Sequence, residues 1–207
     1  MRVLLAGFGP FPGARFNPTT ELVQKLARAR RPALAGLVRT VHVFATSYAA
    51  VDRDMAKLHA DDFDIVLVFG LAARRRHICI ETRARNALSV LFPDASGWRS
   101  ASTSIERGGP NALFGNAPFR RLLHAGQNAK VPIRLSRDAG RYLCNYAYWR
   151  ALERARDGRP LVQFIHIPLL RRHPQPMRPS KYGLLSPAQL LTAAENLLVA
   201  LVAARRR

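Results

Sequence analysis

The sequence predicts an α/β fold, a single-domain three-layer α/β/α sandwich with a mostly parallel twisted sheet. Short apolar runs rich in Val, Ile and Leu alternate along the chain with segments of helical periodicity. This pattern is typical of strands that are buried on both faces and covered by helices. The 207 residues, 48% of them hydrophobic, are enough for one core, and no stretch has a linker composition. We therefore expect one domain over residues 1–207.

Six strands are expected from the apolar runs. Five runs are β-branched and bounded by turn residues: Val3–Ala6, Val38–Phe44, Ile65–Phe69, Val131–Leu135 and Leu161–Ile167. The segment His77–Glu81 alternates in character, and a further short strand is predicted there.

Helical periodicity between these strands predicts four helices, over Thr19–Ala29, Ala49–His59, Pro118–Ala125 and Asn145–Arg156. A last helix has the clearest start, because Ser186 suits the N-cap and Pro187 the first helical position. Apolar residues then recur at helical spacing from Leu190 to Leu201. Two segments have loop compositions, Pro93–Gly109 and Arg171–Gly183.

The formal net charge of +20 raises the question of nucleic-acid binding, because strongly basic surfaces attract polyanions. The arginines are scattered, however, and cluster only at Arg74–Arg76, Arg171–Arg172 and Arg205–Arg207. They do not interleave with aromatic residues as in a single-strand-binding surface. The pattern favours a solvated surface, and a basic nucleic-acid-binding α/β protein stays the alternative from another functional class.

Several absences bear on location and cofactors. No apolar run approaches the roughly 20 residues of a membrane span, and the N-terminus lacks the layout of a signal peptide. We therefore expect a cytoplasmic protein with no membrane partner. The two cysteines, Cys79 and Cys144, do not suggest a disulfide framework. No histidine pair has metal-ligand spacing, so neither a metal nor another cofactor is expected.

The most informative segment is Asp138–Tyr146, which places Cys144 just after a glycine turn and at the start of a predicted helix. The positive end of a helix dipole favours a thiolate there, and free backbone N–H groups can receive an oxyanion. The alternative is a small buried hydrophobic residue, which is the usual role of an unpaired cysteine and the one expected for Cys79.

Two polar residues end buried strands and could assist Cys144. His166 lies near the end of Leu161–Ile167, and Glu81 ends the strand at His77–Glu81. In open α/β sheets, sites gather at the carboxyl ends of strands. A thiol, an imidazole and a carboxylate are the nucleophile, the proton carrier and the orienting group of cysteine hydrolases.

Segments along almost the whole chain resemble the pyroglutamyl peptidase I (pyrrolidone-carboxylate peptidase) family of cysteine peptidases. The likeness lies in Gly7–Gly13, Asn17–Thr19, Gly70–Asn86, Ala139–Asn145 and Phe164–Pro168. The resemblance implies an exopeptidase whose substrate is a peptide with an N-terminal pyroglutamate, and a homo-oligomer, dimer or tetramer. It also implies that Cys144 is the nucleophile, His166 the general base and then acid, and Glu81 the residue that orients His166.

The same resemblance implies a set of substrate-binding residues. Phe8 and Phe11 match the aromatic pair that holds the pyroglutamyl ring, although ordinary core packing would also explain them. The remaining matches are Thr46, Leu71, Arg75, Tyr142 and Leu143. For Arg75, the implied role is to polarise the scissile carbonyl.

Two positions depart from the family pattern. Arg74 stands where a glycine is usual, which puts the shape of its loop in question. Asp138 stands where serine is common, and its charge would disfavour a thiolate at Cys144 if the two were close. A divergent homologue with weak or altered amidase specificity is therefore the alternative within the family.

Overall fold

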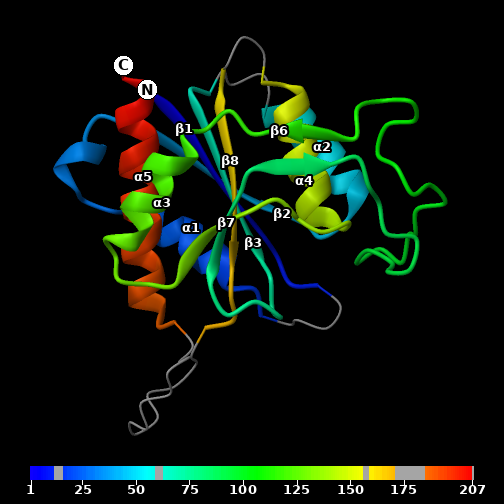
Figure 1. The fold of residues 1–207 in the computed structure, drawn as a ribbon, viewed down its shortest axis with the longest axis horizontal. Helices are drawn as coiled ribbons and strands as arrows, with labels where there is room; N and C mark the ends of the chain where they lie inside the picture. Colours follow the sequence, from blue (N-terminus) through cyan, green and yellow to red (C-terminus); the bar gives the residue numbers. More distant parts are fainter. Residues whose placement is uncertain (12–15, 59–62, 156–158, 171–184, 207) are drawn as a thin grey trace, which may run out of the picture.

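A computed structural model of the protein describes residues 1–11, 16–58, 63–155, 159–170 and 185–206. Its centre is a six-stranded sheet with the order β2-β1-β3-β8-β4-β7 (Figure 1). The strands are β1 (Arg2–Phe8), β2 (Val38–Phe44), β3 (Ile65–Leu71), β4 (Ile78–Glu81), β7 (Ile133–Ser136) and β8 (Leu161–Ile167). Of the adjacent pairs in this sheet, β4–β8 is antiparallel and the others are parallel. The mostly parallel sheet confirms the predicted fold class.

Helices cover both faces of the sheet, as Figure 1 shows. One face carries α1 (Pro18–Ala27), α3 (Phe119–Gln127) and α5 (Pro187–Arg205), and the other carries α2 (Tyr48–Leu58) and α4 (Leu143–Glu153). Each helix layer encloses its own group of buried apolar side chains against the sheet. The sheet therefore separates two cores, and the α2–α4 side is the one that carries the candidate site.

The predicted elements agree with the structure to within a few residues at each end. Among the strands the largest differences are two residues, at the ends of β1 and β3 and at the start of β7, which begins at Ile133 rather than Val131. Three short elements were not predicted, the hairpin strands β5 (Arg83–Arg85) and β6 (Ala112–Phe114) and the 3-10 helix Pro32–Leu34. Some predictions lie outside the described residues, namely the helix ends at His59 and Arg156 and the loop Arg171–Gly183.

Helix α5 begins as predicted, with a capping box between Ser186 and Gln189 and Pro187 in the first turn. By length and composition it could cross a membrane. One side of it, however, is fully buried in the core against the sheet, including Leu190, Ala194, Leu197, Leu198 and Leu201. A buried core helix of a soluble domain has the same composition, so α5 is weak evidence for a span.

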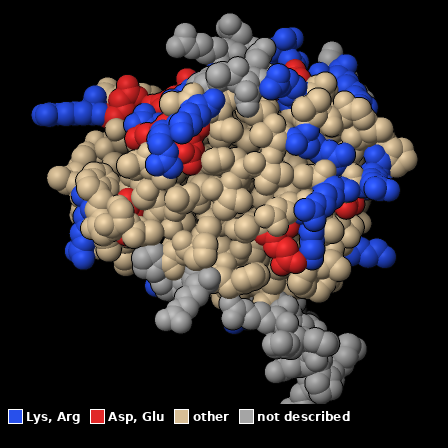
Figure 2. All heavy atoms as spheres, turned by 180° about the vertical axis from the view of Figure 1, so that it is seen from behind, with Lys and Arg blue, Asp and Glu red and all other residues tan. Residues whose placement is uncertain are grey.

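The basic side chains do not form one continuous patch on the face seen in Figure 2. They lie there in separate groups, several of them beside acidic side chains, with a broad area of other residues between them. On this face, the arrangement agrees with the scattered arginines of the sequence.

Candidate active site

A cavity of about 200 Å³ opens at the carboxyl ends of β1, β3 and β8. It is lined by Phe8, Phe11, Asn17, Thr46, Leu71, Ala139, Gly140, Arg141, Tyr142, Leu143, Cys144 and His166. Eight of the ten site residues expected from the sequence are in this lining, and the other two, Glu81 and Arg75, lie behind His166. The structure thus brings together side chains from distant parts of the chain.

Cys144 lies in the first turn of α4, after a turn in which Gly140 has a φ of +84°. That left-handed conformation favours glycine, so the residue type and the turn agree. The thiol is partly exposed and lies on the cavity wall. The first backbone N–H groups of α4 have no carbonyl partner within the helix, and the helix dipole places partial positive charge beside the sulfur.

The thiol also lies against Gly70, near the end of β3. A Cβ atom added at Gly70 would stand 2.8 Å from Cys144 Sγ and 2.7 Å from the ring of Phe164. Both distances are shorter than a van der Waals contact of a carbon atom with sulfur or with a ring carbon. Gly70 therefore leaves the space that the thiol occupies.

His166 connects the thiol to a buried carboxylate. Its Nδ1 lies 2.8 Å from Oε1 of Glu81, which is fully buried, and its ring is within hydrogen-bonding reach of the Cys144 thiol. Burial lowers the pKa of His166, but hydrogen bonds and electrostatic interactions with Cys144 and Glu81 outweigh it and raise the pKa to about 9. The imidazole is thus protonated at neutral pH.

Glu81 reaches His166 differently from the way the sequence suggested. We expected both residues at carboxyl ends on one edge of the sheet, but β4 runs antiparallel to β8. Glu81 pairs with Phe164, two residues before His166, so both side chains point to the same face of the sheet. Tyr148 Oη and Gln163 Nε2 each donate to the Glu81 carbonyl at 3.0 Å and hold its backbone in place.

Arg75 contacts the carboxylate and does not line the cavity. Its Nη1 donates to Glu81 Oε1 at 2.7 Å and to Ser136 Oγ at 3.3 Å, and its Nη2 donates to the Asp138 carbonyl. Burial raises the pKa of Glu81, but His166, Ser136 and Arg75 together outweigh burial and hold that pKa below its usual value. The Glu81 carboxylate is therefore charged and lies between the Arg75 guanidinium and the His166 imidazolium.

Cys79 is fully buried on β4, opposite His166 in the sheet. Burial raises the pKa of its thiol even though Arg75 lies close to it. It is absent from the cavity lining, which agrees with the expected structural role. Among the described residues, no group of three or more His, Cys, Asp or Glu could hold a metal ion.

A network of hydrogen bonds holds the loop that carries Phe8 and Phe11. Thr19 Oγ1 accepts from the Phe8 N–H at 2.9 Å, and Asn17 Nδ2 donates to the Gly9 carbonyl at 3.0 Å. Thr46 Oγ1 donates to the Pro10 carbonyl at 2.7 Å. Thr46, expected as a pocket residue, thus also fixes the loop that presents the aromatic rings.

Four further residues line the cavity that were not expected there from the sequence: Asn17, Ala139, Gly140 and Arg141. Each stands in or beside a segment that carried the family resemblance. Asn17 is the N-cap of α1, where it accepts from the Thr19 N–H at 3.1 Å. Their positions could have indicated the site. Asn17 is in a helix cap and the other three are in the turn before α4, and loops that lead into helices at the ends of strands often carry binding residues.

The two departures from the family pattern have structural explanations. Arg74 is exposed, and no positive φ occurs there among the described residues, so an arginine fits that backbone. Asp138 Oδ1 accepts from the Gly140 N–H at 3.1 Å, and Arg85 Nη1 lies 3.4 Å away. Burial raises the pKa of Asp138, but these partners outweigh it and lower that pKa. The carboxylate caps the glycine turn.

Comparison with known proteins decides the family. Residues 1–206 match the family described as pyroglutamyl peptidase. The chain belongs to the pyroglutamyl peptidase family. Membership makes it a hydrolase of the cysteine peptidase class and confirms the resemblance found in the sequence.

Individual pyroglutamyl peptidases show how close the likeness is. Pyrrolidone-carboxylate peptidase of Vibrio vulnificus (strain CMCP6) is 32% identical over 169 residues, which cover 82% of this chain and 79% of that one. The Pyrococcus furiosus protein of the same name is 32% identical over 174 residues, or 82% of each chain. The crystal structure of pyrrolidone carboxyl peptidase from Thermus thermophilus superposes with a TM-score of 0.81 at 28% identity, covering 96% of this chain and 98% of that one.

Proposed function

We propose that the protein removes N-terminal pyroglutamate from peptides, with Cys144 as nucleophile, His166 as general base and acid, and Glu81 as the orienting carboxylate. The observation that carries this proposal is the position of His166 between Glu81 Oε1, at 2.8 Å, and the thiol on the cavity wall. A thiol, an imidazole and a carboxylate in this order have the geometry of nucleophilic amide hydrolysis.

In the proposed reaction, the Cys144 thiolate attacks the carbonyl carbon of the amide bond that joins the pyroglutamyl residue to the rest of the peptide. As the C–N bond breaks, the His166 imidazolium gives its proton to the leaving amine, and a thioester remains on Cys144. Neutral His166 then takes a proton from water, whose oxygen attacks the thioester; the thiolate leaves as pyroglutamate is released. The pKa of about 9 at His166 supports its starting role as a proton donor.

The oxygen that becomes negative in both steps needs hydrogen-bond donors. We propose that backbone N–H groups in the first turn of α4, including that of Cys144, supply them. They have no acceptor within the helix, and they lie beside the attacking sulfur. Removal of one such donor in other hydrolases costs about 10²–10³ in kcat.

The proposed substrate fits the composition of the cavity. The volume of about 200 Å³ is below that of sites for drug-sized ligands and suits a small ring. Phe8 and Phe11 provide flat apolar walls for a neutral lactam. No described residue in the lining is a carboxylate, and Arg141 is cationic, so an ordinary charged N-terminus finds no carboxylate partner there.

Arg75 is proposed as a positioning residue. Its contacts with Glu81, Ser136 and the Asp138 carbonyl connect the carboxylate to the turn before Cys144. It therefore acts on the substrate through Glu81 and His166, and direct polarisation of the carbonyl is not part of the proposal.

We further propose that residues 1–207 act as one domain, because both cores share one sheet. A cytoplasmic location stays a prediction from the sequence. A dimer or tetramer stays a prediction from the family, and the absence of nucleic-acid binding stays a prediction from the scattered arginines of the sequence. A salt titration against RNA and DNA tests the latter, since a nucleic-acid function requires tight binding at physiological salt with a steep salt dependence.

The experiment that tests the proposal compares three fluorogenic amides of the same coumarin amine, carrying pyroglutamyl, prolyl and glutamyl groups. We expect turnover of the pyroglutamyl amide and at least a hundredfold lower kcat/KM for the other two. The prolyl group has a five-membered ring of the same size but a charged amine and no lactam carbonyl. Comparison of the two amides therefore distinguishes recognition of the lactam from recognition of the ring shape. Equal turnover of the prolyl amide would favour the alternative of an amidase with altered specificity.

A further inference from the structure

Helix α4 contributes more to the candidate site than Cys144. Tyr148 follows Cys144 by one helical turn, so the two side chains lie on the same side of the helix. Tyr148 is fully buried, and its Oη donates to the Glu81 carbonyl at 3.0 Å. Burial and the charge of Glu81 raise the pKa of Tyr148, so the hydroxyl keeps its proton and donates. A single helix thus carries the thiol and contacts the backbone of the residue that orients the imidazole.

Three hydrogen bonds fix the backbone at the end of β4. Glu81 is the last residue of β4 and of its pairing with β8, so its carbonyl lies where the ladder stops. That carbonyl accepts from Tyr148 Oη and from Nε2 of the buried Gln163, both at 3.0 Å. The next carbonyl, that of Thr82, accepts from the Gly115 N–H at 2.9 Å. Groups from outside the strand therefore help to determine where the Glu81 carboxylate projects.

Gly115 leaves the space that the Tyr148 hydroxyl occupies. A Cβ atom added at Gly115 would overlap Tyr148 Oη and would stand 2.9 Å from Cζ of Phe119. The φ angle of Gly115 is outside the left-handed region, so lack of space, and not the backbone, excludes a side chain there. Gly115 and Tyr148 are therefore complementary, and a change of one alters the contact of the other with the end of β4.

We propose that Tyr148 is a positioning residue, which sets the place of the Glu81 carboxylate relative to the thiol of its own helix, and that Gly115 provides the room for this contact. The inference rests on the roles proposed above for Cys144, His166 and Glu81. Tyr148 is not in the lining of the Cys144 cavity, so it acts through Glu81 and does not touch the substrate.

Displacement of the carboxylate would change the charge balance at His166. The titratable groups that face the imidazole are Glu81 from β4 and Cys144 from α4, and Arg75 lies behind Glu81. A carboxylate further from Nδ1 stabilises the imidazolium less, so more of the shared proton stays on the Cys144 sulfur. The thiolate is the reacting form of a cysteine. Loss of the Tyr148 contact should therefore lower both the thiolate fraction and the pH at which His166 loses its proton.

Tyr148→Phe tests the positioning role, because it removes the hydroxyl and keeps the ring, which packs against Phe164 with centroids 5.6 Å apart. We expect kcat for the pyroglutamyl amide to fall about three- to tenfold with KM nearly unchanged, and the alkaline limb of kcat/KM to move to lower pH. Alkylation of Cys144 by iodoacetamide at pH 7 should also slow about threefold. Alkylation needs no substrate. If the unchanged protein did not hydrolyse the amide, the proposed function would fail, and the alkylation rates would still test Tyr148.

Gly115→Ala, alone and combined with Tyr148→Phe, tests the complementary pair. Alone, the added Cβ displaces the hydroxyl, and we expect kcat to fall about tenfold or more. With Tyr148→Phe the oxygen is absent, and the same change should cost at least about threefold less, since the contact with Phe119 is common to both backgrounds. An equal cost of Gly115→Ala in the two backgrounds would contradict the proposed pair.

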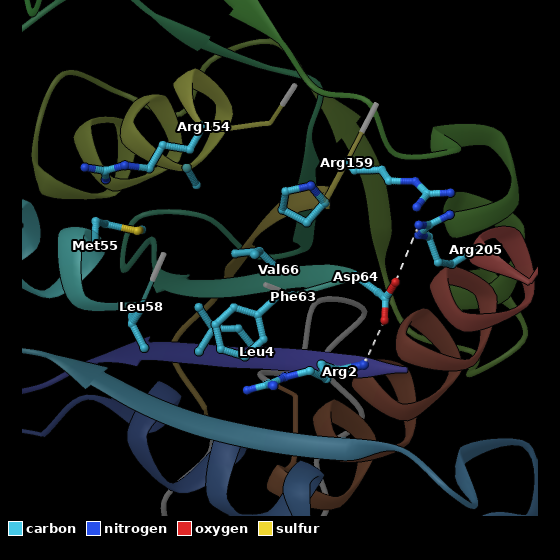
Figure 3. A pocket seen from close by; sticks show the side chains of 12 residues that line it. Arg2, Leu4, Met55, Leu58, Phe63, Asp64, Val66, Arg154, Arg159 and Arg205 are labelled. Atoms are coloured by element: carbon cyan, nitrogen blue, oxygen red, sulfur yellow. Dashed lines mark hydrogen bonds and ion pairs between the residues drawn. The ribbon is translucent and has the colours of Figure 1, made fainter. Parts of the chain in front are cut away.

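Tyr146→Phe is the matched control, because it removes a hydroxyl from the same helix. That hydroxyl donates to Asp52 Oδ2 at 2.7 Å, and Tyr146 is not part of the cavity lining. Met55→Ala is a second control: Met55 belongs to the same core but lines another cavity, of about 370 Å³, near the amino ends of β1 and β3 (Figure 3). Both controls should lower Tm and leave the alkaline limb and the alkylation rate unchanged. If Tyr148→Phe left these two readings like those of the controls, whatever its Tm, the proposal would be overturned.

Discussion

Replacement of Gly70 by alanine tests the position of the thiol. The added Cβ would lie 2.8 Å from Cys144 Sγ and 2.7 Å from Phe164 Cζ, whereas ordinary contacts begin at 3.4 Å. The sulfur and the ring must therefore each move by about 0.6 Å or more, unless the backbone at Gly70 shifts instead. Phe164 in turn packs against His166, with ring centroids 5.0 Å apart, so a shifted ring disturbs the imidazole as well.

The size of the effect follows from these distances. A misplacement of about 1 Å at a reacting group can cost about 10²-fold in rate, and we expect kcat/KM for the pyroglutamyl amide to fall about 10- to 100-fold. Overpacking of a core costs about 1–3 kcal/mol. For a chain of this length each kcal/mol lowers Tm by about 2–4 °C, which differential scanning calorimetry measures.

Gly126→Ala is the matched control. Gly126 lies on α3, on the other face of the sheet from the cavity. Its added Cβ would meet Cδ1 of Ile133, which lies on β7. The end of the Ile133 side chain can turn aside and alanine favours a helix, so we expect little change in Tm there and an unchanged kcat/KM. If Gly70→Ala lowered Tm but kept full kcat/KM, the thiol would not react from the position described. An unchanged Tm and an unchanged kcat/KM would refute the close contact itself.

Cys144→Ser is expected to reduce turnover at least 10³-fold while Cys79→Ser keeps most of it, since Cys79 is buried outside the cavity; steady-state assays of both variants check this. The imidazolium form of His166 persists up to its pKa of about 9, so kcat/KM should fall as pH rises through that value. Glu81→Gln removes a negative partner, which should move this alkaline limb to lower pH and reduce kcat, as pH–rate profiles would show. Asp138→Ser should lower Tm by a few degrees with kcat/KM near the original value, because Asp138 caps a turn; a large gain in kcat/KM would instead mean that its charge hinders the thiol.

Local patterns in the sequence were sufficient for most of the fold. The runs Val38–Phe44 and Leu161–Ile167 are strands with the predicted bounds, since continuous β-branched segments between turn residues have few alternatives. The hairpin of β5 and β6 was missed because each strand has three residues and mixed polarity, Arg83–Arg85 being largely charged. Its pairing depends on tertiary contacts that periodicity does not contain.

Strand direction was the main feature of the site that the sequence could not supply. The antiparallel course of β4 places Glu81 opposite Phe164, and this pairing determines how the carboxylate reaches His166. The contact of Arg75 with Glu81 depends on the same arrangement. Because the sequence does not contain this contact, we expected Arg75 to act on the substrate, whereas the structure leads us to propose that it acts behind His166. Periodicity predicts which residues form a strand, whereas the direction and the neighbours of that strand depend on the packing of the whole sheet.

The central claim is that Cys144 carries the acyl group during turnover. The most direct measurement is peptide mass mapping after rapid acid quench of the protein with a pyroglutamyl 4-nitrophenyl ester, a substrate whose fast first step favours accumulation of the intermediate. We predict a pyroglutamyl adduct on the peptide that contains Cys144, none on the peptide that contains Cys79, and loss of the thioester adduct in Cys144→Ala. An adduct on another residue, or turnover that persists in Cys144→Ala, would contradict the account.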